Sequence, residues 1–179
     1  ALKLAPLVFV RPGELRKAEW TEFDLTAGEW NIPPQRRKLK KALKDDPATP
    51  PHCVPLATQA VAILRELRPL TGDGRFVFPG ARDRRNRPMS DAALTSALRR
   101  LGYDSRAMTP HGFRAIARTI LDEGLGFRTD FIEHQLGHSV KDPNGRAYNR
   151  TRHLDARRKM MQAWAEYLDR MRNDSVTGT

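Results

Sequence analysis

The chain has 179 residues, which is enough for one domain with a substantial core and short of two typical domains. Its 32 Lys and Arg residues outnumber 21 Asp and Glu residues, and the net charge of +11 is spread over nearly every segment, so a polyanion such as nucleic acid is the default partner. The only cysteine, Cys53, excludes an internal disulfide, and no apolar run approaches the roughly 20 residues of a membrane span.

The first segment predicts two helices that meet near Arg11. Residues 2–9 are apolar enough for a buried helix, and because the chain opens directly on this pattern we expect it to begin inside a longer protein. Pro12 suits the first position of the second helix. Arg11 therefore lies at a helix–helix junction, where Glu14, three residues on, can hold it.

The next segment predicts a β-hairpin with a long basic loop. Residues 29–32 and 53–56 look like its two strands, and the nearby prolines are typical of short edge strands. The loop can lay its cationic groups along phosphates. These groups are Arg36, Arg37, Lys38, Lys40 and Lys41.

The rest of the chain is predicted to be helical, which makes the fold mainly α with a small antiparallel β-sheet. Arg84 and Arg85 lie in an exposed basic loop, and the polar residues 173–179 are expected to be disordered. The helices are predicted over residues 58–72, 90–102, 109–123, 130–136 and 154–171.

Residues 109–150 hold an unusual polar cluster. Thr109 and Pro110 can start a helix that places His111 and Arg114 on one face. A second short helix ends in Leu136-Gly137-His138, and Tyr148 follows ten residues later. The first helix is expected to bury a stripe of Phe113, Ile116, Ala117 and Ile120.

The chemistry of this cluster favours a phosphodiester. His134 and His138 have helical spacing, but the segment reads HQLGH rather than HExxH and Gly137 interrupts the helix, so no metal site is expected. The sequence has no Walker-type loop, dinucleotide glycine pattern or Gly-x-Ser-x-Gly elbow. Guanidinium groups can hold the non-bridging oxygens of a phosphodiester while a tyrosine hydroxyl attacks phosphorus.

Four sequence motifs follow one another along the chain: Arg-x-Gly-Glu-Leu, His-x-x-Arg, Leu-Gly-His and a tyrosine ten residues later. In this order they resemble the catalytic motifs of tyrosine recombinases, the phage integrase family. Residues 109–114 and 142–150 look typical of prophage and genomic-island integrases. The resemblance covers nearly the whole chain and corresponds to the C-terminal catalytic domain, residues 1–172, so the N-terminal DNA-binding domains of such integrases are absent from this chain. The motifs are Arg11-Pro12-Gly13-Glu14-Leu15, His111-Gly112-Phe113-Arg114, Leu136-Gly137-His138 and Tyr148.

The resemblance implies a role for each motif residue. Arg11 and Arg114 would bind the scissile phosphate, and Tyr148 would form a 3′-phosphotyrosyl link to DNA. His111 and His138 would hydrogen-bond the phosphate and help to move the tyrosine proton.

The family also uses a lysine of the β-hairpin as general acid for the leaving 5′-hydroxyl. Lys38 fits best, with Lys40 and Lys41 as alternatives, and the long Pro-rich hairpin departs from many relatives. Glu14 would brace Arg11. The remaining cations expected to contact DNA are Arg36, Arg37, Lys40, Lys41, Arg84 and Arg85.

The expected function is that of a site-specific DNA recombinase that integrates or excises a mobile element. The expected partners are double-stranded attachment sites and further copies of the chain, which would form a tetramer on DNA and be monomeric as an isolated domain. No metal or other cofactor is expected, and we expect a bacterial cytoplasmic protein, without membrane attachment, that joins the nucleoid when on DNA.

Two alternatives stay open. A non-catalytic DNA-binding or regulatory module of the same fold would bind DNA in a salt-dependent manner without cutting it. A type IB topoisomerase shares the catalytic arrangement but would relax supercoils without a sequence requirement. The prophage-like motifs favour the integrase.

Overall fold

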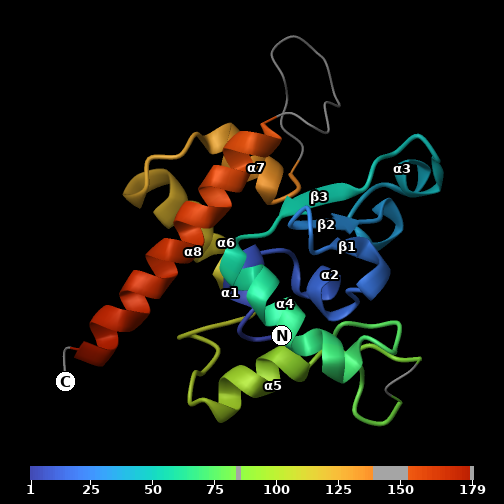
Figure 1. The fold of residues 1–179 in the computed structure, drawn as a ribbon, viewed down its shortest axis with the longest axis horizontal. Coiled ribbons are helices and arrows are strands. Elements are labelled where there is room, and N and C mark those ends of the chain that lie inside the picture. Colours follow the sequence, from blue (N-terminus) through green and yellow to red (C-terminus); the bar gives the residue numbers. More distant parts are fainter. Residues whose placement is uncertain (84–85, 139–152, 178–179) are drawn as a thin grey trace.

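The computed structural model of the chain describes residues 1–83, 86–138 and 153–177. The described part is mainly helical with one small antiparallel sheet, as the sequence predicts (Figure 1). The elements in order are α1 (Ala5–Val8), α2 (Pro12–Arg16), η1 (Trp20–Glu22), β1 (Phe23–Asp24), β2 (Glu29–Ile32), η2 (Pro34–Arg36), α3 (Lys41–Asp45), β3 (His52–Pro55), α4 (Thr58–Thr71), α5 (Ala93–Arg100), α6 (Gly112–Thr119), η3 (Ile120–Gly124), α7 (Thr129–Gln135) and α8 (Leu154–Thr177).

The sheet has the order β1-β2-β3, and all pairs are antiparallel. The predicted hairpin forms with Trp30 opposite Val54, and the short β1 adds a third strand that the sequence analysis missed. Trp30 and Ile32 alternate with less buried residues and turn their side chains into the core. The long connection between β2 and β3 includes a 3₁₀ turn and the short helix α3.

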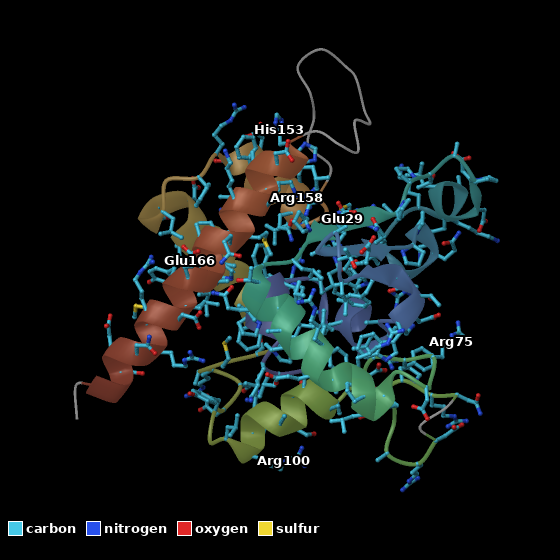
Figure 2. The ribbon with its side chains drawn as sticks, viewed as in Figure 1. Glu29, Arg75, Arg100, His153, Arg158 and Glu166 are labelled. Carbon is cyan, nitrogen blue, oxygen red and sulfur yellow. The ribbon has the colours of Figure 1, made fainter. Side chains whose placement is uncertain are left out.

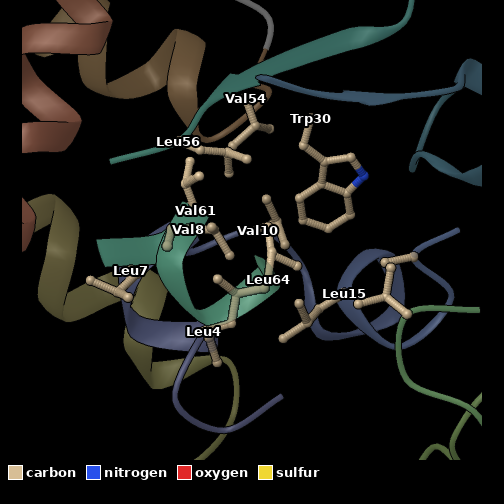
Figure 3. Packing of buried hydrophobic residues seen from close by; sticks show 14 of the residues in the cluster. Leu4, Leu7, Val8, Val10, Leu15, Trp30, Val54, Leu56, Val61 and Leu64 are labelled. Atoms are coloured by element: carbon tan, nitrogen blue, oxygen red, sulfur yellow. The ribbon is translucent and has the colours of Figure 1, made fainter. Parts of the chain in front are cut away.

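The first of two apolar clusters joins the sheet to α1 and α4. Figure 3 shows Leu4, directly before α1, and Val8 of α1 beside Leu64 of α4, with Trp30 and Val54 of the sheet on the other side. All five side chains are fully buried. Burial of a large apolar side chain stabilises a fold by about 1.5–3 kcal/mol, so this cluster fixes how the sheet and the N-terminal helices meet.

The second cluster joins α6, α7 and α8. Its buried members include Leu121, Ile132 and Trp164, and it is completed by Phe9 from the end of α1. The Phe9 and Trp164 rings meet edge to face with centroids 6.2 Å apart. Phe9 thereby ties the N-terminal segment to the C-terminal helices, although some 150 residues separate it from Trp164 in the sequence.

The structure corrects two of the predicted helices. The helix expected over residues 109–123 begins at Gly112 and changes to a wider π-helical turn over Ile120–Gly124. Within the predicted stripe Ile116 is 44% exposed, because the helix instead turns Arg114 inward, where main-chain carbonyls bind its guanidinium. The last helix, α8, continues to Thr177, so residues 173–177 are helical where a disordered tail was predicted.

α8 runs along one side of the molecule and contacts the sheet near its N-terminal end (Figure 1). There the Arg158 side chain lies beside Glu29 of β2, with which it forms an ion pair (Figure 2). Arg158 also donates to the main-chain carbonyl of Ala27, 2.8 Å away. Within the described residues, no helix is long and apolar enough to cross a membrane.

Candidate active site

Arg114 is the buried centre of the site. Its side chain points inward from α6 and is only 5% exposed. The guanidinium donates through Nη1 to the carbonyl of Phe9 at 2.8 Å and through Nη2 to the carbonyl of Leu136 at 2.9 Å. These two bonds hold the guanidinium plane between the end of α1 and the end of α7, so its direction is set by elements far apart in the sequence.

The Phe9 carbonyl reaches Arg114 because α1 ends abruptly. Phe9 adopts the left-handed conformation with φ 33°, which few non-glycine residues adopt. The chain then turns into the extended residue Arg11, which caps α2. Such a conformation costs about 1–3 kcal/mol and persists only where surrounding packing imposes it, as burial of the Phe9 ring does here.

His138 lies directly beside Arg114 at the end of α7. Its Nε2 is 3.3 Å from Nη2 of Arg114, and its Nδ1 bonds to the carboxylate of Glu133. Because a carboxylate only accepts, the proton of a neutral ring lies on Nδ1 and leaves Nε2 as an acceptor toward the site. Burial alone would raise the pKa of Glu133, but the bonds from His138 and Arg118 lower it below the ordinary glutamate value.

Arg11 is braced by Glu14, as the sequence analysis expected. The Arg11 amide donates to Oε2 of Glu14 at 2.9 Å, and its Nη1 donates to Oε1 at 3.1 Å. Glu14 is 3% exposed, whereas the Arg11 side chain stays partly open to solvent. The carboxylate therefore orients a guanidinium whose remaining donors are available to an anion.

The electrostatic effects bring several of the predicted site residues near one another. Burial and the charge of Arg11 lower the pKa of Arg114 to about 10. Burial and the charges of Arg114, Arg11 and Lys38 lower the pKa of His111. The charges that act on His111 therefore come from three separate segments, and His138 touches Arg114. A bound anion would relieve this repulsion.

The basic hairpin divides into inward and outward side chains. Arg36 pairs with Glu22 and the carbonyl of Lys17, and its side chain is 12% exposed, so the protein itself engages its charge. Arg37 donates to the carbonyl of Gly137 at 3.2 Å. Lys38, Lys40 and Lys41 are exposed.

Three predicted site residues, Tyr148, Arg84 and Arg85, lie outside the described residues. The described residues contain no group of three or more His, Cys, Asp or Glu side chains that could hold a metal ion.

Apart from Glu14, sequence reasoning missed the residues that support the site. His52, at the start of β3, lies 3.1 Å from the carbonyl of Gln135, and Glu133 bonds to His138. Arg157 of α8 donates to the side chain of Gln135 and to the carbonyl of Cys53. Only Glu133 has a local signal, since it lies one turn before His138; the others come together from distant segments.

The comparisons with known proteins agree with this geometry. The fold resembles that in the crystal structure of XerA recombinase, with a TM-score of 0.57 at 17% identity over 96% of this chain and 55% of that chain. The described fold is thus that of a recombinase. The model of the phage integrase family matches residues 1–154, and the chain belongs to this family.

Two of its relatives are named integrases. The chain is 42% identical to the integrase of Enterobacteria phage P4 over 99% of its own length and 41% of the relative. It is 39% identical to prophage integrase IntA of Escherichia coli K12 over 97% of its length and 39% of the relative. The chain therefore spans less than half the length of the curated relatives it matches.

Proposed function

We propose that the chain is the catalytic part of a site-specific recombinase that cuts and rejoins DNA through a 3′-phosphotyrosine. The observation that carries this proposal is the convergence of Arg11, Lys38, His111, Arg114 and His138 from separate segments. Such a site suits the charge of a phosphodiester in its transition state. The match to integrase-named relatives supports the same reaction.

Arg11 and Arg114 bind the non-bridging oxygens of the scissile phosphate. Arg114 arrives with its plane fixed by the carbonyls of Phe9 and Leu136, and Arg11 with its direction fixed by Glu14. Pre-oriented donors need no rearrangement as negative charge grows on phosphorus, and removing one such donor typically costs about 100- to 1,000-fold in rate.

His111 and His138 complete the phosphate site. The lowered pKa of His111 keeps its ring neutral near pH 7 in the absence of DNA, and a phosphate charge would raise that pKa again. His138, oriented by Glu133, presents Nε2 to the site beside Arg114. Nε2 can accept the proton of the attacking hydroxyl and, once protonated, donate to the phosphate. The ring of His111 can donate to the phosphate through its own N–H group.

Lys38 is the general acid that protonates the leaving 5′-oxygen. Among the hairpin lysines it is the one whose charge acts on His111, which supports it over Lys40 and Lys41. An ammonium near the leaving oxygen supplies the proton in the same step in which the P–O bond breaks. General acid catalysis of this kind contributes about 100- to 10,000-fold.

Tyr148 is the nucleophile. It follows His138 by ten residues, and ten residues can span up to about 35 Å, so chain length allows it to reach the phosphate. The phenol oxygen bonds to phosphorus while its proton passes to a histidine of the site. The phosphorus–5′-oxygen bond breaks as Lys38 gives its proton to the leaving 5′-oxygen. Because one phosphodiester replaces another, the reverse reaction on a partner duplex rejoins DNA without an energy source.

The substrate is double-stranded DNA at the attachment sites of a mobile element, bound with further copies of the chain as a tetramer. The exposed cations Lys40 and Lys41 follow Lys38 on the same connection between β2 and β3, and they can contact flanking phosphates. A net charge of +11 favours this partner. We place the reaction in the bacterial cytoplasm, on the nucleoid.

A covalent trapping assay tests the proposal. The chain and its Tyr148→Phe variant are incubated with a nicked duplex that carries the junction sequence of the genetic element encoding the chain, and products are separated on a denaturing gel. A protein–DNA band that forms without added metal and is absent from Tyr148→Phe is the expected result. DNA binding without any band would instead favour a non-catalytic module, and sequence-independent relaxation of supercoils would favour a topoisomerase.

A further inference from the structure

The end of α7 is held by side chains from three other segments. The last carbonyls of a helix have no partner within it and must bond elsewhere. Here three consecutive carbonyls, those of residues 135–137, each lie within hydrogen-bonding distance of a side chain from outside the helix. The pairs are His52 Nε2 with Gln135 at 3.1 Å, Arg114 Nη2 with Leu136 at 2.9 Å, and Arg37 Nη2 with Gly137 at 3.2 Å.

Two of these three donors belong to the β2–β3 hairpin. Arg37 follows η2, which comes after β2, and His52 is the first residue of β3. Both ends of the connection between these strands therefore contact the turn that precedes His138. The turn carries His138, and the hairpin carries Lys38. The contacts thus connect two separate parts of the active site through main-chain atoms rather than through the catalytic side chains themselves.

The approach of Arg37 depends on the absence of a side chain at Gly137. Gly137 has φ +69°, and a Cβ there would lie 3.1 Å from Nη2 of Arg37 and 3.6 Å from Nη1 of Arg11. A side chain would therefore crowd the guanidinium of Arg37 and come into contact with that of Arg11. The glycine of this motif is needed for close packing as well as for its backbone conformation.

Lys38 itself has no such anchor. It is exposed, and no hydrogen bond or ion pair of its side chain occurs within the described part of the chain. A lysine has four side-chain torsions, so its ammonium is placed mainly by the main chain that carries it. The nearest fixed point on that main chain is the preceding residue, Arg37, through its bond to Gly137.

We propose that Arg37 is a positioning residue, which anchors the β2–β3 hairpin on the carbonyl of Gly137 and so directs Lys38 toward the leaving 5′-oxygen. This inference rests on the role of Lys38 in the proposed function. It also gives Arg37 a different task from the phosphate contact expected from the sequence: its guanidinium acts on the protein, and its effect on the reaction passes through Lys38.

The test compares two leaving groups in the trapping assay. In one substrate the scissile 5′-oxygen is replaced by sulfur, which leaves readily as a thiolate because thiols have a pKa of about 8.5 and need no proton from an acid. A defect confined to the general acid is therefore corrected by sulfur, whereas a defect in phosphate binding or in the nucleophile is not. Both substrates are used at saturating protein.

The variants are Arg37→Ala and Arg37→Lys. Lysine keeps the positive charge but ends about one bond short of the Gly137 carbonyl. Comparison of the two variants therefore distinguishes the loss of the charge from the loss of the hydrogen bond. Arg100→Ala, which removes an exposed arginine of α5 far from the sheet, controls for the loss of one charge (Figure 2). Thermal melting of each variant checks that it folds.

Both Arg37 variants are expected to cut the oxygen substrate about 10- to 100-fold more slowly, as displacement of a catalytic group by about 1 Å does. Both should approach the wild-type rate on the sulfur substrate, as Lys38→Ala should. Equal defects on both substrates, or a defect in Arg37→Ala that Arg37→Lys fully repairs, would overturn the positioning role and make Arg37 a phosphate contact. A Lys38→Ala variant that sulfur does not rescue would instead refute the assignment of Lys38.

Discussion

Arg157 of α8 and Gln135 of α7 form a fully buried side-chain pair directly behind the active site. Oε1 of Gln135 accepts from Nε of Arg157 at 3.2 Å and from Nη2 at 2.6 Å, and the same Nη2 donates to the carbonyl of Cys53 at 2.7 Å. Burial lowers the pKa of Arg157 to about 10. The side chain of Arg157 thus links α8, α7 and the sheet. The main-chain carbonyl of Gln135 in turn bonds to the ring of His52.

Arg157→Ala should therefore destabilise the fold. It would leave the side-chain oxygen of Gln135 and the carbonyl of Cys53 without their donor, and each buried group left unsatisfied costs about 1–3 kcal/mol. We expect urea unfolding to report a loss of about 2–4 kcal/mol in the free energy of unfolding. Arg158→Ala, on the next position of α8, should cost less than about 1 kcal/mol because its side chain is more exposed. Equal losses would contradict the linking role of Arg157.

Gly137→Ala should impair DNA cleavage beyond its effect on stability. Alanine in the left-handed region costs about 1–2 kcal/mol, and the added Cβ would crowd the guanidinium of Arg37. Gly102 is the matched control, since it also has positive φ, +88°, but nothing lies within 4 Å of its Cβ position. We expect both variants to lose similar stability in thermal melts and only Gly137→Ala to lose covalent adduct. Normal cleavage by Gly137→Ala would show that the crowding is harmless.

His52 should make stability fall as the pH drops below about 6.5. Burial and the charges of Arg157, Arg37 and Arg11 lower its pKa well below the ordinary 6.5, and only the bond to Gln135 opposes this. Below pH 6.5 the unfolded chain then binds a proton that the folded chain does not, so stability falls as pH falls, by up to about 1.4 kcal/mol per pH unit. Urea unfolding at a series of pH values measures the slope, and His52→Asn should flatten it. An unchanged slope in that variant would assign the effect to other groups.

Arg36 and Lys40 should respond differently although both are cations of the same hairpin. Arg36→Ala breaks the pair with Glu22, whose carboxylate also accepts from the indole of Trp30, and should cost about 1–3 kcal/mol of stability with little change in DNA affinity. Lys40→Ala should leave stability unchanged and reduce the salt dependence of DNA binding by about one phosphate contact. Binding isotherms at several salt concentrations, with unfolding curves, measure both. If Arg36→Ala also reduced the salt dependence of DNA binding, Arg36 would be a DNA contact, as the sequence analysis expected.

Much of the fold could be predicted because its signals are local. The strand composition around Trp30 and Cys53, the proline that starts α2 and the glycine before His138 act within a few residues of themselves. The family motifs likewise named Arg11, His111 and His138, which lie near Arg114. The order of the motifs along the chain carries that information without any coordinates. Tyr148 lies outside the described residues, so its place in the site stays a prediction.

The burial of site residues and the contacts that support them could not be predicted, because they depend on segments far apart in the sequence. Because Arg114 is charged, the hydrophobic periodicity assigned Ile116 rather than Arg114 to the buried face of this helix. The structure buries Arg114 because the carbonyls of Phe9 and Leu136 accept hydrogen bonds from it. Arg36 and Arg37 look equivalent in the sequence, yet one meets Glu22 and the other Gly137.

The sequence by itself determined the type of fold, the motif residues and the excess of positive charge, since each depends on composition or on local order. Only the tertiary structure decided which cations are held inside the protein and which stay exposed, because hydrogen-bond partners of a buried guanidinium come from wherever the chain folds back. His52, Gln135 and Arg157 are separated by up to 105 residues, and only packing of α7 and α8 against the sheet brings them together.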